Sequence, residues 1–590
     1  MRGPAPVERH LRRVRLRILS LAILLGIAAA VILVRLVRYQ VFLAGTIRGQ
    51  ARQQQERVIE LSPARGAIFD ATGRELAVSV PVDSLFLDPS LFRDRDREVR
   101  KVARALGVGP ERVQASLRRG GRRFAWVQRK LKPGTRDRIE ALGIPAAGFL
   151  PEYRRLYPKK TLAAHLLGYV GVDDQGLAGL ESGFNTRIRG EPGLLFAYRD
   201  ARGARIPIQV DRPAREGRSL VLTVDEVIQH VVERELEAAW TATGARAATA
   251  VLIDPESGRI LALANRPTFD PNRFAAFPES HLRNRGVADC FEPGSTFKVF
   301  TWAAAWQDGR IRNGERIDCR GGAIRVAGRN IHDHERFGVL TVSEVLAHSS
   351  NVGAILIGDR IGDARFHGFL TGFGFGRPTG IDLPGESPGI LNPREAWSRT
   401  SMASLSMGHE VCVNPVQLTV ALAAAANGGI LYRPGVVEAV LGGAGDPDQR
   451  FSPAGVRVLE PATAGRMRWE LRNAVETGTG QAARLRDYTV GGKTGTAQKP
   501  EPGGGYSSTR FVASFFGFAP ATRPAIAALI LLDEPRGKHY GGEVAAPVFA
   551  RIAPEVLHYL RVAPDRHREG GRDMFARLDV APGRGGTAAR

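Results

Sequence analysis

Two residues near the middle of the chain, Ser295 and Lys298, have the types and the spacing that a nucleophile and its base require. They stand in EPGSTFKVF, residues 292–300, where Pro293 and Gly294 end a loop and a helix is expected to begin. Residues three apart lie on one face of a helix, with Cβ atoms about 5–6 Å apart. A serine hydroxyl is inert until a base removes its proton, so the lysine amine has to be neutral. Burial or a second nearby cation would lower the lysine pKa in that direction.

The Ser-x-x-Lys pattern is short, and a serine at a helix start followed by a surface lysine would also produce it. Lysine is scarce here, however: only nine of the 83 Lys and Arg residues are lysine, and Ser295–Lys298 is the one pair with this spacing. The scarcity favours a functional interpretation, which further motifs have to support.

A second motif is HSSNVG, residues 348–353, in which Ser349 stands two residues before Asn351. On a loop, a hydroxyl and an amide with this spacing point the same way, so they could relay a proton and hold a substrate amide. Such triplets are also ordinary loop sequence, and alone this one carries little weight.

A third motif is GGKTGTAQK, residues 491–499, where strand-like sequence resumes. The edge of a strand offers backbone N–H groups to an oxyanion, and Gly495 would let a substrate lie close to it. Lys493 supplies a second cation, which could pair with a substrate carboxylate and lower the pKa of Lys298. The alternative is a glycine-rich hairpin.

Taken together and in this order, the three motifs resemble those of the penicillin-recognising serine enzymes, the penicillin-binding proteins and serine β-lactamases. Longer stretches are similar to class B penicillin-binding proteins, whose pedestal or dimerisation domain precedes a transpeptidase domain. These stretches are ARGAIFDATGRELAVS (64–79), RLYP (155–158), AHLLGYVG (164–171), GLAGLESGFN (176–185), NRGVADCFEPGSTFK (284–298), SMGHEVCVNPVQLTVALAAAANGG (406–429) and YGGEVAAPVF (540–549).

The resemblance implies roles for the motif residues in peptidoglycan cross-linking. Ser295 would attack the penultimate D-alanine carbonyl of a stem peptide, and Lys298 would take its proton. Ser349 would relay that proton to the leaving D-alanine, and Asn351 would bind the substrate amide. An amine of a neighbouring stem peptide would then attack the acyl-enzyme, and β-lactams would trap Ser295.

The resemblance also implies a binding edge in the third motif. Lys493 and Thr494 would hold the terminal carboxylate of the substrate, with Gly495 beside them. The backbone N–H groups of Ser295 and Thr496 would form the oxyanion hole. No cofactor is implied.

An apolar stretch near the N-terminus predicts a membrane anchor. Residues 18–34 are apolar except for Ser20, which is near the lower limit for crossing a hydrocarbon core of about 30 Å. Five arginines within residues 9–17 precede the stretch, so the positive-inside rule puts the N-terminus in the cytoplasm and the rest of the chain outside it. A cleavable signal peptide is the alternative, but apolar residues continue beyond 28–30, the small-residue site.

The order of elements predicts an α+β fold, in which an antiparallel sheet flanked by helices rests on an elongated mixed α/β pedestal behind one transmembrane helix. Strands are expected at 220–225 and 248–265, a helix at 226–240, and further strands from 490 to 532. A polar stretch at 39–57 is expected to be helical. The segments are 1–17 as cytoplasmic N-terminus, 18–38 as transmembrane anchor, 39–61 as juxtamembrane stalk, 62–216 as pedestal, 217–560 as transpeptidase domain and 561–590 as a disordered tail.

Charge, composition and the cysteine count bear on which binding partners and metals are expected. The formal net charge is +23, but the arginines are spread along the chain and no nucleic-acid-binding motif is found, so no nucleic acid is expected. The cluster HDHE at 332–335 lacks a further ligand set, which favours a polar loop beside the active site over a metal site. The three cysteines, Cys290, Cys319 and Cys412, allow at most one disulfide, and their pairing stays open.

Other functions fit the sequence less well than a class B transpeptidase. A bifunctional class A enzyme would carry a glycosyltransferase domain after the anchor, a β-lactam sensor would have several spans, and a β-lactamase would lack anchor and pedestal. An elongation-type class B enzyme and a non-catalytic scaffold of the division complex remain alternatives. The short stalk and RDARGARIP (199–207) look more like the division type. Expected partners are stem peptides, β-lactams, the membrane, a polytopic glycan polymerase and division proteins.

Overall fold

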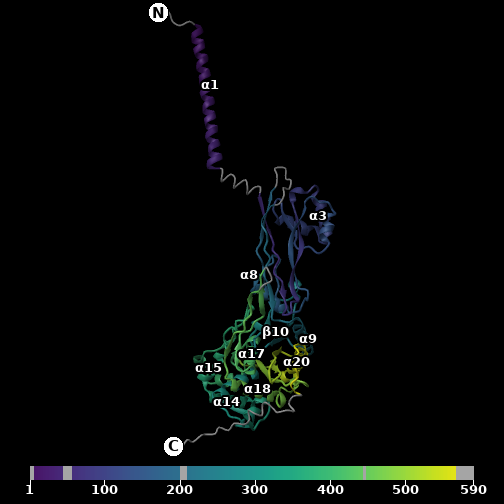
Figure 1. Ribbon diagram of the computed structural model, residues 1–590, viewed down its shortest axis with the longest axis vertical. Coiled ribbons are helices and arrows are strands. Elements are labelled where there is room, and N and C mark those ends of the chain that lie inside the picture. The colour runs from purple at the N-terminus through teal and green to yellow at the C-terminus, as the bar shows by residue number, and fades with distance from the viewer. Residues whose placement is uncertain (1–5, 44–55, 199–208, 443–446, 502, 567–590) are drawn as a thin grey trace, which may run out of the picture. The chain divides into compact units, whose positions relative to one another are not determined.

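The computed structural model describes residues 6–43, 56–198, 209–442, 447–501 and 503–566 (Figure 1). The chain forms two compact units. One consists of Met1–Pro63 with Glu191–Arg215, and the other of Ala64–Gly190 with Glu216–Arg590. The predicted tail spans 561–590, and its part from residue 567 onward lies outside the described residues, as does the RDARGARIP segment (199–207).

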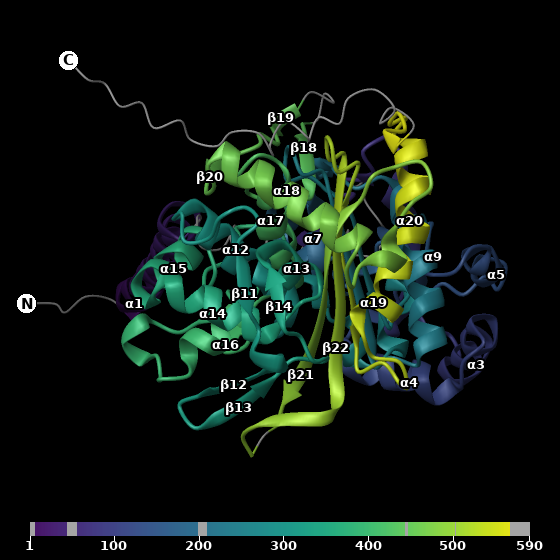
Figure 2. The ribbon, with the colours of Figure 1, turned by 90° about the horizontal axis from the view of Figure 1, so that it is seen from below.

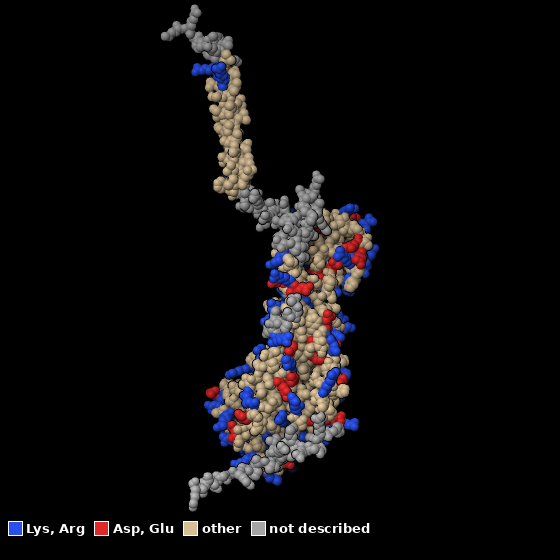
Figure 3. Space-filling view, in the orientation of Figure 1, with Lys and Arg blue, Asp and Glu red and all other residues tan. Residues whose placement is uncertain are grey.

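The first unit begins with one long helix, α1 (Pro6–Val37), which continues as a π-helical turn, η1 (Arg38–Phe42). Within the described residues, Val14–Phe42 is the one helical stretch long and apolar enough to cross a membrane, with a mean hydropathy of 2.6 and no buried residues. Figure 3 shows Lys or Arg side chains near the N-terminal end of α1 and mostly uncharged surface along the rest of the helix, whose last turn carries Arg35. These features agree with the predicted single-pass anchor at 18–38 and with cationic residues before it.

The stalk differs from the prediction at its far end. Residues Glu56–Leu61 form a strand, β1, rather than the end of a helix that was expected to reach residue 57. Strand β1 pairs antiparallel with β6 (Gly193–Tyr198), which pairs in turn with β7 (Gln209–Arg212). The partner strands lie more than 130 residues away, so the local sequence could not reveal them. Residues 44–55 are outside the described part of the chain.

The second unit contains a mixed sheet that joins the pedestal to the rest. Strand β2 (Ile68–Phe69) pairs parallel with β8 (Ser219–Leu222) and antiparallel with β3 (Glu75–Leu87). The helices α3 (Arg95–Leu106), α4 (Pro110–Arg119) and α5 (Thr135–Glu140) share a separate hydrophobic core with β3 and its neighbours. The remaining strands of this sheet are β4 (Ala125–Gln128), β5 (Ala147–Leu156), β18 (Val437–Leu441) and β19 (Pro447–Arg450).

A fully buried ion-pair network fixes the pedestal where its motifs meet. The Glu181 carboxylate accepts from Arg65 at 2.7 Å and from Arg155 at 2.6 Å, and all three side chains are at most 1% exposed. The three residues come from three of the stretches that resemble the pedestal. Each carboxylate oxygen thus has its own guanidinium, and close hydrogen-bonded pairs of this kind can offset the cost of burying charge.

A five-stranded antiparallel sheet forms the centre of the catalytic part, in the order β10-β9-β23-β22-β21. The hairpin β9 (Ala247–Ile253) and β10 (Ile260–Arg266) comes first in the sequence. Strands β21 (Gly491–Pro500), β22 (Tyr506–Ala519) and β23 (Ile526–Asp533) follow some 225 residues later, and β23 pairs with β9. The sheet therefore unites strands from both ends of the catalytic sequence, as the pattern predicts.

Helices cover both faces of this sheet (Figure 2). One face packs against α9 (Glu226–Thr243) and α20 (Ala546–Tyr559). The other packs against a larger group that includes α12 (Lys298–Gln307), α14 (Asn351–Ile361) and α17 (Pro415–Ala426). The predicted helix at 226–240 is thus confirmed as α9.

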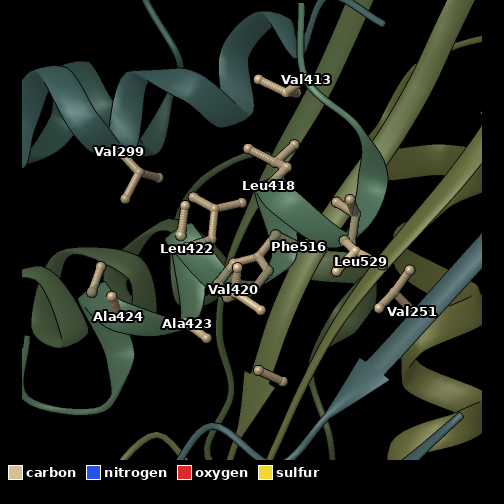
Figure 4. Close-up of a cluster of buried hydrophobic side chains, with 14 of the residues drawn as sticks. Val251, Val299, Val413, Leu418, Val420, Leu422, Ala423, Ala424, Phe516 and Leu529 are labelled. Atoms are coloured by element: carbon tan, nitrogen blue, oxygen red, sulfur yellow. The ribbon is translucent and has the colours of Figure 1, made fainter. Parts of the chain in front are cut away.

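Helix α17 is buried along its whole length and lies between α12 and the sheet. Figure 4 shows Val299 of α12 on one side of α17, and Phe516 and Leu529 of the sheet on the other. Leu418 and Leu422 of α17 fill the space between them. The packing against this apolar helix fixes the position of α12, which carries Lys298, relative to β21.

The predicted disordered tail begins later than expected. After α20, Asp565 accepts hydrogen bonds from the Thr489 backbone N–H, at 2.7 Å, and from the Thr522 hydroxyl, at 2.7 Å. The prediction of disorder was therefore wrong for 561–566, because a single carboxylate that satisfies several donors anchors an otherwise featureless segment.

Candidate active site

The candidate nucleophile Ser295 lies at the start of the helix that the sequence predicts. A 3-10 turn, η4 (Gly294–Phe297), leads directly into α12. Gly294 has a φ of +55°, and a Cβ there would lie 3.0 Å from Cβ of Ala497 on β21. Glycine is therefore favoured where the loop turns against the strand. Ser295 is half-buried and opens into a cavity of about 920 Å³.

The candidate base Lys298 is completely buried directly beneath the cavity. Its amine donates to the Ser349 carbonyl oxygen at 2.6 Å, to the Ser349 hydroxyl at 3.3 Å and to Asn351 Oδ1 at 2.8 Å. The first two motifs therefore meet in space, although about 50 residues separate them. Among the described residues, the Ser295 hydroxyl itself forms no hydrogen bond.

The second lysine, Lys493 of β21, also donates a hydrogen bond to Ser349, the serine that Lys298 contacts. Its amine donates to the Ser349 hydroxyl at 2.9 Å and to the Thr494 carbonyl oxygen at 3.1 Å. Ser349 has a φ of +61°, an uncommon backbone conformation for a residue with a side chain. This conformation is compatible with a hydroxyl held between two amines, where the serine could pass a proton from one group to another.

Both amines have strongly lowered pKa values. Burial lowers the pKa of Lys298 to about 7, although the nearby Asp333 carboxylate raises it. Burial and then the charge of Lys298 lower the pKa of Lys493 well below its ordinary value. Burial dominates for both lysines, so the second cation is less important for Lys298 than the sequence suggested. A lysine with a pKa near neutrality can act as a base.

Asp333 is a residue that sequence reasoning missed. Its carboxylate accepts from the backbone N–H groups of Asn351 and Val352 and from the Ser350 hydroxyl, the last at 2.7 Å. It thereby holds the N-terminus of α14 and the loop that carries Ser349. Asp333 belongs to the HDHE cluster, and its spacing alone gave no sign that it anchors the second motif.

The same cluster forms the loop beside the cavity that we expected. His334 and Glu335 line the cavity wall, while the His332 carbonyl accepts from the Asn351 amide at 2.9 Å. Among the described residues, no group of three or more His, Cys, Asp or Glu side chains is arranged to hold a metal ion.

Strand β21 forms the edge of the sheet and one wall of the cavity. Thr494 and Thr496 both line it, as expected for a substrate-binding edge. The Thr494 hydroxyl shares a hydrogen bond of 2.6 Å with Thr479, and Thr496 accepts from the Gly541 N–H at 3.1 Å. Thr479 and Gly541 are supporting residues that no motif indicated.

Gly495 has a different environment from the one predicted. A Cβ at this position would collide with the Ser514 hydroxyl and would lie 3.1 Å from the Pro293 carbonyl oxygen. The missing side chain therefore lets β21 approach the loop that precedes Ser295. The structure places Gly495 in this close packing rather than on the cavity wall.

One disulfide lies close to the nucleophile. Cys290 and Cys412 are bonded, with Cα atoms 5.5 Å apart, while Cys319 is free and buried. The bond joins the segment before Ser295 to the segment after α16 (Ser401–Met407), and Phe291 and Val413 form a β-bridge beside it. The pairing that the sequence left open is thus Cys290 with Cys412.

Comparisons with known proteins agree with this geometry. Residues 248–553 match the family described as penicillin binding protein transpeptidase domain, and residues 60–222 match the penicillin-binding protein dimerisation domain. The chain is 32% identical to the peptidoglycan D,D-transpeptidase FtsI of Escherichia coli over 594 residues, which cover 99% of this chain and 98% of that protein. It is 34% identical to the probable peptidoglycan D,D-transpeptidase PbpC of Pseudomonas aeruginosa over 553 residues, covering 93% and 96%.

Solved structures show the same fold. Penicillin binding protein 3 of Mycobacterium tuberculosis, complexed with ampicillin, superposes with a TM-score of 0.69 at 28% identity. The match covers 86% of this chain and 98% of that one. By its sequence, its fold and the meeting of its three motifs, the chain belongs to the class B penicillin-binding proteins.

Proposed function

We propose that this chain is a peptidoglycan D,D-transpeptidase that cross-links stem peptides at the division septum and is a target of β-lactams. One observation carries the proposal: the Ser349 hydroxyl lies between two buried lysine amines, on the wall of the cavity into which Ser295 opens. This arrangement supplies a nucleophile, a base with a lowered pKa and a proton relay in one place.

In the first half-reaction, Ser295 Oγ attacks the carbonyl carbon of the penultimate D-alanine. Its proton goes to the neutral amine of Lys298. Ser349 relays a proton to the nitrogen of the terminal D-alanine as the C–N bond breaks. The product is an ester between the stem peptide and Ser295, and free D-alanine leaves.

The substrate is held by the walls of the cavity. Asn351 binds the peptide amide, and Lys493 with Thr494 binds the terminal carboxylate. The N–H groups of Ser295 and Thr496 stabilise the oxyanion, while Gly495 keeps β21 close to the nucleophile loop. In the second half-reaction, an amine of a neighbouring stem peptide displaces Ser295 and forms the cross-link.

In this proposal, the chemistry takes place outside the cytoplasm. Residues 1–17 lie in the cytoplasm, 18–38 span the inner membrane, and 39–61 connect to the pedestal at 62–216. The catalytic domain, 217–560, faces the periplasm. The cations before the apolar helix support this orientation (Figure 3). Anchor and pedestal contact a polytopic glycan polymerase and other division proteins, as the similarity to FtsI supports.

Labelling with a fluorescent penicillin tests the nucleophile. The full chain in detergent should take one covalent label, and Ser295→Ala should lose it. Ser280→Ala, at an exposed position, should be labelled like the original chain. A folded chain that takes no label would overturn the enzyme proposal in favour of a scaffold. A fluorescent fusion that followed the side wall instead of the septum would favour the elongation type.

A further inference from the structure

A second acid–base pair, of which His409 lines the same cavity, is not used by the three motifs. His409 Nδ1 lies 2.9 Å from Glu292 Oε2. Glu292 Oε1 also accepts from the Glu410 backbone N–H at 3.0 Å and from the Tyr506 hydroxyl at 3.2 Å. The His409 and Glu292 side chains are 24% and 16% exposed, so the pair is mostly shielded from water.

The hydrogen bonds determine which nitrogen of His409 is free. An ionised carboxylate can only accept hydrogen bonds, so His409 Nδ1 carries the hydrogen and donates it to Glu292. In the neutral ring, Nε2 then bears the lone pair. A carboxylate partner of this kind fixes the tautomer and orientation of a histidine. Within the described part of the chain, Nε2 has no hydrogen-bond partner.

The backbone holds His409 next to the nucleophile. Gly408 precedes His409, Gly294 precedes Ser295, and the Gly294 N–H donates to the Gly408 carbonyl at 3.0 Å. Both Ser295 and His409 line the one cavity. The bond between Cys290 and Cys412 brackets the two segments. The pair is therefore built into the nucleophile loop and is not an isolated surface contact.

Two other histidines line this cavity, and neither has such a partner. His539 stacks on Phe511, with ring centroids 4.1 Å apart, and its Nδ1 lies 3.3 Å from the Gly537 carbonyl. His334 packs edge-on against Phe337. Of the three, His409 alone has a ring nitrogen bonded to a carboxylate. It is the histidine of this cavity that is prepared to take a proton.

We infer that His409, oriented by Glu292, is the base that deprotonates the acceptor amine in the second half-reaction. This inference rests on the proposed transpeptidase function. The acceptor is a primary amine that arrives as an ammonium ion, and an ammonium ion cannot attack the ester until it loses a proton. His409 Nε2 accepts that proton and later releases it to water.

The remaining protons and bonds of this half-reaction are accounted for by groups already described. The freed amine nitrogen forms a bond to the acyl carbon, and the bond from that carbon to Ser295 Oγ breaks. The second proton of the amine passes through Lys298 and Ser349 to Ser295 Oγ. The product amide keeps one hydrogen, and the enzyme returns to its starting state with one proton released.

The two half-reactions can be measured separately on the full chain. Acylation is followed with fluorescent penicillin, which needs no acceptor amine. Turnover of a thioester donor is followed with D-alanine as acceptor, and the aminolysis product is compared with the hydrolysis product. His409→Asn keeps a donor towards Glu292 but lacks Nε2, and His409→Gln places an amide near the Nε2 position. His367→Asn on α15 (Asp363–Gly372) is the control.

We expect both His409 variants to lose aminolysis by about 100-fold, the lower range for a general base, while acylation falls by no more than about threefold. The ratio of aminolysis to hydrolysis should fall accordingly, and the control should keep both rates. Aminolysis that persists in both variants, with acylation intact, would overturn the inference about His409. A parent chain that is not acylated would instead overturn the proposed function. Equal losses of acylation and aminolysis would assign His409 a structural role and also overturn the inference.

Discussion

Lys298 and Lys493 donate hydrogen bonds to the same oxygen, the Ser349 hydroxyl, at 3.3 and 2.9 Å. Two protonated amines that both contact one hydroxyl in a buried site would repel each other. The lowered pKa values of both lysines follow from burial first, and for Lys493 from the charge of its neighbour as well. The pair thus favours a state in which at least one amine is neutral.

The first prediction concerns the pH dependence of acylation. Lys298 can take the Ser295 proton only when it is neutral, and its pKa is lowered to about 7. Protonation below that pH removes the base, so the acylation rate should rise as the pH increases through about 7 and level off above it. An ordinary lysine, with a pKa of about 10.4, would give a rate that still rises beyond about pH 9.

Second-order rates of penicillin acylation between about pH 5.5 and 9.5, at constant ionic strength, would measure this profile. Because the two amines interact, the midpoint belongs to the pair rather than to one residue. A rate that climbs steadily over the whole range would exclude a neutral Lys298 at physiological pH.

The second prediction concerns Asp333. Asp333→Asn removes the charge that raises the pKa of Lys298, so the midpoint of the acylation profile should move to lower pH. It also weakens the hydrogen bonds that hold Ser350 and the start of α14. The free energy of unfolding should fall by about 1–3 kcal/mol, as for a partly buried charged acceptor.

The control for Asp333 is Asp363→Asn, at an exposed acid in the first turn of α15. It should leave the pH midpoint and the stability close to those of the parent chain. A midpoint that moves upward in Asp333→Asn would contradict the electrostatic role given to this carboxylate.

The third prediction compares two glycines with similar backbones. Gly408 and Gly428 have φ values of +87° and +92°. A Cβ at Gly408 would collide with the Gly294 carbonyl oxygen, whereas a Cβ at Gly428 would meet nothing within 4 Å. Gly428→Ala should therefore cost only the left-handed strain of about 1–2 kcal/mol, with acylation intact.

Gly408→Ala should cost more stability and should slow acylation, because the backbone beside Ser295 has to move. Thermal unfolding and penicillin labelling of both variants would separate backbone strain at the glycine from displacement of the Ser295 backbone. If Gly408→Ala acylated as fast as Gly428→Ala, the contact between Gly408 and Gly294 would not position the nucleophile.

The fourth prediction concerns the pedestal. Glu181→Gln leaves Arg65 and Arg155 buried without their carboxylate, and breaking such a pair costs about 3–5 kcal/mol. Asp83→Asn is the matched control, because its ion pair with Arg136 is exposed, with side chains 28% and 47% accessible. Exposed pairs contribute about 0–1 kcal/mol. Denaturant unfolding of the full chain in detergent would measure both, and equal effects would contradict the buried network.

Much of this architecture could be predicted from the sequence because its signals are local or rare. The apolar run of α1, the amphipathic pattern of α9 and the apolar strands at both ends of the catalytic part are local patterns. Lys298 and Lys493 are rare residues in motifs of fixed order. Local or motif-based signals of this kind do not depend on knowing which segments meet in space.

The missed features depend on distant partners. Asp333 and Thr479 contact the motifs from other segments, and nothing in their own neighbourhoods marks them. Strand β1 requires β6. The ordered residues 561–566 require the bond between Asp565 and Thr489. Neither of these two elements therefore followed from local sequence.

The sheet of the catalytic part has a consequence for how the protein is made. Strand β9 pairs with β23, which is synthesised about 270 residues later. If the segment after the anchor crosses the membrane in sequence order, as in the proposed topology, the β9–β10 hairpin exposes an unpaired edge until β23 follows, and such an edge is prone to aggregation. The nucleophile helix has no finished sheet to pack on until β23 has crossed. In the proposed topology, export rather than the catalytic chemistry is therefore the stage at which a truncated or stalled chain is most vulnerable.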